Sequence, residues 1–201
     1  MTTRTAVLAL HYQNEVLHPD GKIRLGVADD ARRGAVIAAA RLLLAQARAA
    51  AVPIVHVRIA FRADFADVIQ NCAIFRNVVR IGACVDGSWG AEFYDGLGPV
   101  GGELVVKHSR VNAFYGAPLD EALRVHGAAR LIVAGVATNS VVETTVRHAA
   151  DAGYEVIVAG DACAAADPAL HAASLANMAL IAEVMPVADI AALRAASPST
   201  K

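Results

Sequence analysis

The sequence has few of the residues that mark several common classes of protein. Only 5% of its 201 residues are aromatic, and its three cysteines, Cys72, Cys84 and Cys163, show no CxxC spacing. An odd number of cysteines without that spacing favours neither a disulfide framework nor a zinc module. The apolar residues, 56% of the chain, are therefore mainly aliphatic, which is typical of helices packed closely on a sheet rather than of an aromatic-rich sandwich.

An excess of charge of one sign is also absent. The 18 Lys and Arg residues nearly balance the 19 Asp and Glu residues, for a net charge of -1, so no basic surface for nucleic acid or anionic lipid is expected. The apolar runs are far shorter than the roughly 18 residues of a membrane span, and residues 6–10 are too short for a signal-peptide core. We therefore expect a cytoplasmic protein with no nucleic-acid partner and no membrane association.

What the sequence does contain is an alternation of short apolar runs and helical patterns. Uninterrupted apolar runs are typical of strands buried on both faces, and they lie at residues 6–10, 54–59, 104–106, 131–134, 156–159 and 182–185. Helical patterns separate them at 29–50, 118–125, from about 138 to before 153, and 168–181. The alternation predicts an α/β fold, a three-layer doubly wound sheet of about six mostly parallel strands with helices on both faces.

Residues 61–102 break this alternation. They hold several glycines, the only tryptophan, Trp89, and two of the cysteines. We interpret them as a long excursion over the sheet, within a single domain that spans residues 1–201. Because ligands of open parallel sheets bind at the carboxyl ends of the strands, the candidate functional residues are those that follow the apolar runs.

Four of the segments that follow or include these runs resemble one family in composition and order. They read AVLALHYQNE (6–15), KHSRVNAF (107–114), GVATNSVV (135–142) and DAGYEVIVAGDAC (151–163). Together they are similar to the isochorismatase-like hydrolases, also called cysteine hydrolases, which include nicotinamidases and N-carbamoyl-amide hydrolases. The resemblance covers nearly the whole chain. It implies a hydrolase of small molecules that needs no cofactor and assembles as a homodimer or homotetramer.

The chain departs from this family at the residues that carry its chemistry. Most members use an Asp after the first strand, a Lys after the third and a Cys at a helix N-terminus, where the helix dipole stabilises the thiolate. These positions fall on His11, Lys107 and Val141, so only the lysine survives. Valine offers no nucleophile, which makes thioester catalysis at position 141 impossible. Ser140 is expected to face away from that pocket, because adjacent helical residues point about 100° apart.

His11 and Lys107 are then the candidate catalytic residues. An imidazole titrates near neutrality, so His11 is suited to act as a general acid or base, and a nearby ammonium from Lys107 would favour its neutral form. Two alternatives stay open. His11 could be a polar replacement tolerated after the chemistry was lost, and Lys107 a structural partner of a carboxylate such as Glu15.

The remaining parts of the expected pocket surround this pair. Backbone amides of residues 137–141 would form an anion or oxyanion site, and the resemblance implies a cis peptide bond between Val136 and Ala137. Val141 would widen the apolar side, and Gln13 and Asn14 are expected to hold loops by hydrogen bonds rather than touch substrate. The residues expected to shape the pocket are Phe61, Trp89, Asn112 and Phe114.

No metal ion is expected. Nicotinamidase-like members carry an Asp-x-His…His cluster after the second strand, whereas residues 56–64 read HVRIAFRAD here. Of these, only His56 could act as a histidine ligand, and its place within a strand is typical of a buried, hydrogen-bonded histidine. The other histidines lack the spacing of a zinc site. Cys72 and Cys84 are expected to be packing residues rather than nucleophiles, and Cys163 falls where small packing residues are usual in the family.

Two functions remain open at this point. The first is an isochorismatase-like hydrolase that acts on a small carbonyl, amide or enol-ether compound without a cysteine nucleophile; isochorismatases proper also lack the cysteine. The second is a pseudoenzyme, a ligand-binding or oligomer-forming subunit that kept the fold and lost the chemistry. Convergence of His11, Lys107 and Val141 on one partly polar cavity would favour the first.

Overall fold

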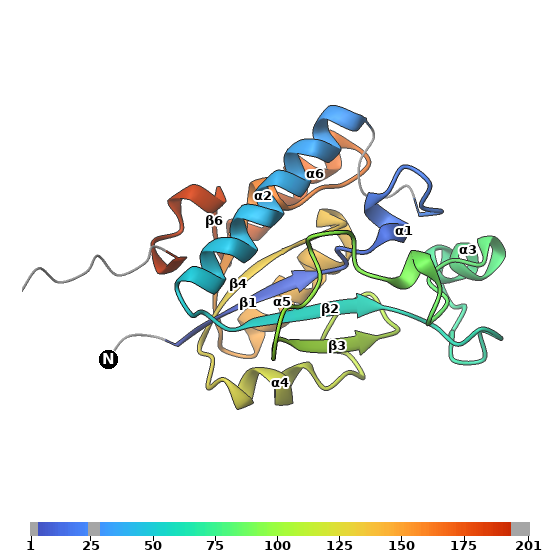
Figure 1. Ribbon diagram of the computed structural model, residues 1–201, viewed down its shortest axis with the longest axis horizontal. Helices are drawn as coiled ribbons and strands as arrows, with labels where there is room; N and C mark the ends of the chain where they lie inside the picture. Colours follow the sequence, from blue (N-terminus) through green and yellow to red (C-terminus); the bar gives the residue numbers. More distant parts are fainter. Residues whose placement is uncertain (1–3, 24–28, 194–201) are drawn as a thin grey trace, which may run out of the picture.

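A single parallel sheet forms the centre of the molecule. The computed structural model (Figure 1) describes residues 4–23 and 29–193. Its strands are β1 (Thr5–Leu10), β2 (Ile54–Ile59), β3 (Leu104–His108), β4 (Arg130–Gly135), β5 (Glu155–Ala159) and β6 (Glu183–Met185). They lie in the order β3-β2-β1-β4-β5-β6 and every neighbouring pair is parallel. The predicted fold is confirmed, and the sheet is wholly rather than mostly parallel.

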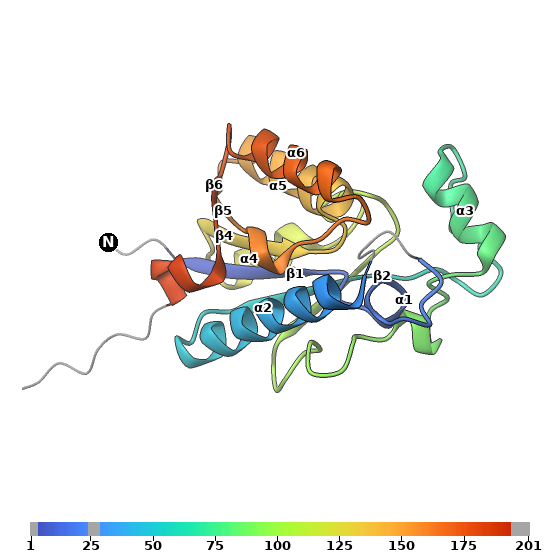
Figure 2. The same ribbon diagram turned by 90° about the horizontal axis from the view of Figure 1, so that it is seen from above.

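Helices cover both faces of this sheet. They are α1 (Asn14–Leu17), α2 (Asp30–Ala49), α3 (Ala73–Ile81), α4 (Leu119–Val125), α5 (Glu143–Asp151) and α6 (Pro168–Met178). Helix α2 lies on one face, while α4, α5 and α6 lie on the other (Figure 2). The carboxylate of Asp29 begins α2 by accepting a hydrogen bond from the backbone N–H of Arg32 at 2.8 Å, an N-cap that satisfies one of the unpaired donors of the first turn.

Strand β1 lies at the middle of the core, and its end approaches the end of β4 closely. Residues 6–10 of β1 are fully buried. Leu10 is paired with Gly135, whose φ is +154° and on which a Cβ would lie 2.2 Å from the carbonyl oxygen of Leu10. Only glycine fits this approach. The strand order reverses between β1 and β4, which is where such sheets bind ligands.

The excursion between β2 and β3 is more ordered than the sequence analysis predicted. It contains the nine-residue helix α3 and a short 3₁₀ turn, η1 (Trp89–Ala91), and α3 stands beyond the end of the sheet, apart from the other helices (Figure 2). Apolar residues of α3 and its flanks form a second core cluster, separate from the main one, made of Phe61, Phe75, Val78, Ala83 and Cys84.

Side chains that follow β1 attach the excursion to the sheet. The Gln13 amide donates to the carbonyl oxygens of Ala91 at 2.8 Å and Ile59 at 3.0 Å, and the Asn14 amide donates to that of Trp89 at 2.9 Å. The prediction that Gln13 and Asn14 hold loops is confirmed. Within residues 4–23 and 29–193, no helix is long and apolar enough to cross a membrane.

Candidate functional site

A small cavity lies at the carboxyl ends of the central strands, where the strand order reverses. It has a volume of about 50 Å³, which is room for a few water molecules or one compact ligand. Three of its lining residues carry polar side chains: His11, Arg110 and Ser140. The rest of the lining is apolar: Val16, Ile23, Ile59, Ile74, Phe75, Val78, Val111, Val136 and Ala137.

His11 is the first residue after β1 and is held in a strained conformation. Its φ is +55°, in the left-handed region, which is uncommon for any residue except glycine, although His, Asn and Asp are found there more often than most. Its N–H donates to the carbonyl oxygen of Val57 at 2.9 Å, and the residue is 7% exposed. Strained residues of this kind cluster at functional sites.

The partner of His11 is His108, the last residue of β3. The two Nε2 atoms lie 2.5 Å apart, with ring centroids at 4.8 Å. Because β2 lies between β1 and β3, the two rings meet across the end of β2. His108 is 3% exposed, and its Nδ1 lies 3.4 Å from the backbone oxygen of Asn112.

Both imidazoles are neutral at pH 7. Burial holds the pKa of His11 well below its usual value, and the neighbouring His108 lowers it further. Burial lowers the pKa of His108 to about 4, against the opposing effect of the Asn112 carbonyl. We assign Nδ1–H of His108 as the donor to that carbonyl, which makes its Nε2 the acceptor of the hydrogen bond from Nε2–H of His11. The Nδ1 of His11 then carries a lone pair and is the ring nitrogen left to bind a proton.

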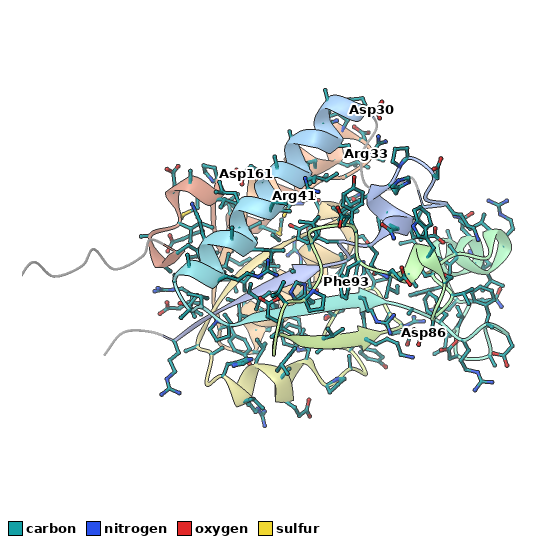
Figure 3. The ribbon with its side chains drawn as sticks, in the orientation of Figure 1. Asp30, Arg33, Arg41, Asp86, Phe93 and Asp161 are labelled. Carbon is teal, nitrogen blue, oxygen red and sulfur yellow. The ribbon has the colours of Figure 1, made fainter. Side chains whose placement is uncertain are left out.

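Lys107 does not lie beside His11. Successive side chains of a strand point to opposite faces, so Lys107 and His108 diverge. The Nζ of Lys107 lies 3.0 Å from the carboxylate of Asp86, which also binds Arg58 at 2.9 Å; Figure 3 labels Asp86 beside the ends of β2 and β3. The hydrogen bond from Lys107, aided by Arg58, lowers the pKa of Asp86. The expectation that Lys107 is the electrostatic partner of His11 is therefore corrected: His108 takes that place.

Glu15 is not the partner of Lys107 either. Glu15 is 3% exposed, and its carboxylate accepts hydrogen bonds from the backbone N–H groups of Cys84 at 3.0 Å and Lys22 at 3.1 Å. A Cβ on Gly90 would lie 2.5 Å from this carboxylate. Glu15 therefore anchors both the excursion and the segment after α1 to the end of β1.

The segment after β4 forms another wall of the cavity. The peptide bond between Val136 and Ala137 is cis, at the place that the resemblance implies. Residues Thr138–Val142 then form a π-helical turn, η2, that leads into α5. Ser140 lines the cavity, whereas Val141 is 1% exposed and packs in the main core. Both expectations for this pair are reversed, because a five-residue turn aims side chains differently from the α-helical spacing assumed for them.

Several backbone amides of this segment donate to protein carbonyl groups and are not free for an oxyanion. The N–H groups of Thr138, Ser140 and Val142 donate to the carbonyl oxygens of Ala164 at 2.8 Å and of Ala137 at 3.2 and 3.3 Å. Among the described residues the amide of Ala137 has no such partner, and Ala137 lines the cavity. Asn139 and Val141 do not line the cavity, so among the lining residues the amide of Ala137 is the candidate oxyanion donor.

Two residues expected to shape the pocket lie just behind it. Phe61 is fully buried, and its ring meets that of Phe75 edge-on at 6.3 Å, so it supports a lining residue without lining the cavity itself. Asn112 does not line the cavity either. Its backbone oxygen faces His108, and its side-chain oxygen accepts from the N–H of Phe114 at 2.8 Å.

The other two expected pocket residues lie elsewhere. Trp89 is half-exposed and packs edge-on against His18, with ring centroids at 4.9 Å. Phe114 belongs to the main core and stacks on the exposed His148, with ring centroids at 4.5 Å. Neither residue lines the cavity, because each ring packs against a histidine that lies outside it.

Helix α3 supplies the lining that the sequence analysis missed. Ile74, Phe75 and Val78 project from it into the cavity. Their spacing of three and four residues is a helical apolar stripe, a signal that was present in the sequence but lay inside a segment interpreted as irregular.

The cysteines lie away from the cavity lining. Cys84 and Cys163 are buried, and burial raises the pKa of each thiol to about 12, so both are protonated at neutral pH. Cys72 is partly buried against the second core cluster. His56 is fully buried and contacts the Glu103 carboxylate at 2.8 Å, as expected for a core histidine. In the described part of the chain, no three His, Cys, Asp or Glu residues are grouped to hold a metal ion.

Comparisons with known proteins agree with this architecture. A family model described as the Isochorismatase domain matches residues 5–189. The ureidoacrylate amidohydrolase RutB of Methylobacterium radiotolerans is 31% identical over 187 residues, which cover 87% of this chain and 72% of the relative.

Solved structures give the same result. A cysteine hydrolase from Pseudomonas syringae pv. phaseolicola has a TM-score of 0.83 at 27% identity and covers 93% of this chain and 90% of its own. An isochorismatase family protein from Desulfovibrio vulgaris has a TM-score of 0.83 at 29% identity, covering 93% of this chain and 96% of its own. With the family model spanning nearly all of the sheet and its helices, the chain belongs to the isochorismatase family of hydrolases.

Proposed function

We propose that this protein hydrolyses a small amide or N-carbamoyl compound with an activated water molecule and without a cysteine nucleophile. The observation that carries the proposal is the contact between two buried histidines, His11, which lines the cavity, and its partner His108. A pair of titratable groups in a pocket at the end of the central strands is suited to proton transfer. The relative named as a ureidoacrylate amidohydrolase supports an amide as the bond cleaved.

The proposed reaction uses His11 first as a base and then as an acid. A water molecule bound to Nδ1 of His11 attacks the amide carbonyl carbon and gives its proton to that nitrogen. As the tetrahedral intermediate collapses, the imidazolium returns the proton to the leaving nitrogen and the C–N bond breaks. One water is consumed, and an acid and an amine or ammonia are released.

His108 and Ala137 have supporting roles in this scheme. The Nε2 of His108 accepts the hydrogen bond from His11 Nε2–H, which fixes the tautomer and stabilises positive charge on His11 during the reaction, as an orienting group does for a catalytic histidine. The amide of Ala137 is the donor available to the oxyanion.

A mechanism without cysteine follows from the residues at the positions that the resemblance assigns to the catalytic Asp and Cys. These are His11 and Val141. No cysteine replaces the missing thiol, because none of Cys72, Cys84 and Cys163 lines the cavity, and Cys84 and Cys163 are buried and protonated. A hydroxyl nucleophile would have to be Ser140, which lines the cavity.

The test is turnover of a panel of small amides, including nicotinamide, N-carbamoylglycine and 3-ureidopropionate, followed by ammonia release. His11→Asn keeps a residue that tolerates the left-handed conformation and should lower kcat by about 100-fold or more with an unchanged circular dichroism spectrum. Ser140→Ala and Lys107→Gln are matched controls that should stay within about threefold. Full activity in His11→Asn, or loss of activity in Ser140→Ala, would refute the assignment of His11 as the catalytic base.

The alternative of a pseudoenzyme is favoured by Val141, which replaces the residue that the family uses as nucleophile. It predicts no turnover of any amide in the panel by the native protein. Amidase activity gained by His11→Asp combined with Val141→Cys, against none in the parent, would support it.

A further inference from the structure

The cavity carries one uncompensated cation. Among the described residues that line it, Arg110 is the only one with a formal charge at neutral pH, since no Asp, Glu or Lys lines it and His11 is neutral. Within residues 4–23 and 29–193, Arg110 forms no ion pair with an Asp or Glu carboxylate, whereas Arg58, Arg62 and Lys107 each do.

Arg110 is fixed in place by neutral groups. Its Nη1 donates to the carbonyl oxygen of Ile69 at 3.2 Å, and its Nη2 donates to the side-chain oxygen of Asn71 at 3.1 Å. The guanidinium carbon lies 4.2 Å from the centroid of the Phe75 ring. A guanidinium has five N–H donors, so these contacts orient the group while leaving donors and the full charge for a ligand.

The surroundings strengthen the attraction of this charge for an anion. The cavity walls are aliphatic and aromatic side chains, and electrostatic interactions are stronger where water is displaced by such groups. Arg110 is partly exposed, whereas His11 is 7% exposed. A ligand that spans both would therefore place its anionic end toward solvent and its other end against His11.

We propose that Arg110 binds the carboxylate of the substrate, so that the compounds hydrolysed are small monocarboxylic acids with an apolar middle and the cleavable amide at the opposite end. A guanidinium matches a carboxylate through two parallel hydrogen bonds. This assignment rests on the proposed function for the cleaved bond, but recognition of the carboxylate does not require turnover.

The test is binding of butyrate and of its neutral isostere butyramide, measured by ligand-observed NMR titration. The native protein should bind butyrate more tightly than butyramide. Arg110→Gln should weaken butyrate at least tenfold and leave butyramide within about twofold. Arg76→Gln is the matched control, because Arg76 also donates to the same loop, at the carbonyl oxygen of Gln70, but does not line the cavity; it should leave both affinities unchanged.

Three other binding results would overturn the inference. An equal loss of both ligands in Arg110→Gln would make Arg110 a clamp for the loop of residues 69–71, and an unchanged affinity for butyrate, or no binding of butyrate by the native protein, would remove the carboxylate site. Failure of the proposed function is seen separately, as butyrate binding without turnover of any amide. Equal turnover of acids and their neutral analogues would refute only the role of Arg110.

Discussion

The buried histidine pair should make the protein lose stability in mild acid. Its imidazoles bind protons less readily in the folded protein than in the unfolded chain, because burial lowers the pKa of both. Between pH 7 and the lowered pKa values the unfolded state therefore binds more protons, and the free energy of unfolding falls as the pH falls. Above the pKa of about 6.5 that a histidine has in the unfolded chain, both states are neutral and this loss of stability is absent.

The size of this effect follows from His108. Its pKa is about 4 in the folded protein. The pKa of a histidine in the unfolded chain is about 6.5. The difference between the two pKa values lowers the free energy of unfolding by about 3 kcal/mol once the pH is below the folded-state pKa, and by about 2 kcal/mol between pH 7 and pH 5. His11 acts in the same direction. His108→Gln removes the titrating group and keeps an acceptor for His11, so its loss of stability over this range should be smaller by about 2 kcal/mol.

Urea denaturation at pH 7 and pH 5 measures both free energies. Carboxylates such as Glu103, with a pKa of about 2, also contribute in acid, but they do so equally in the native protein and the variant. Val78→Ala is the control: it removes buried apolar atoms and no titrating group, so it should lower the free energy equally at both pH values. Equal pH dependence in the native protein and His108→Gln would refute the account of the pair.

Three further predictions concern activity, packing and the thiols. Because the pKa of His11 is lowered, hydrolysis should keep its full rate from pH 8 to about pH 6 and decline only in stronger acid; a rate profile that halves near pH 6.5 would contradict this. Gly135→Ala should destabilise the protein by about 2 kcal/mol or more, since its Cβ would meet the Leu10 carbonyl at a positive φ; thermal denaturation within 2 °C of the native protein would show that this approach is not tight. Cys84 and Cys163 should react with iodoacetamide only after unfolding, and alkylation of Cys72 should leave activity intact; inactivation on alkylation would point to a catalytic thiol.

The strands could be predicted from the sequence because burial on both faces leaves an unmistakable pattern. Residues 54–59 form β2 with the boundaries expected, and the other apolar runs match their strands to within two residues. The position of His11 at the crevice followed from the same argument, since it is the first residue after a central strand. Its left-handed backbone, in contrast, has no local signal in the sequence.

The partner of His11 could not be predicted, because it depends on where β3 ends and on which face of the sheet its last side chains take. Strand β3 ends at His108 rather than at residue 106, and the alternation of side chains then sends Lys107 to Asp86 and His108 inward. Ser140 and Val141 exchanged their expected places for a similar reason, a π-helical turn that the pattern of residues does not reveal. Arg110 belongs to the segment 107–114 that follows β3, but its position at the cavity depends on contact with Phe75 of α3, a helix that the sequence did not predict.

A double-mutant cycle of His11→Asn and His108→Gln on a hydrolysed amide tests the central claim most directly. If the two histidines act as one unit, each single variant should lower kcat/KM by about 100-fold or more, and the double variant should be little worse than either. Activity that survives in His11→Asn, or losses that simply multiply in the double variant, would contradict the claim that this pair carries the chemistry.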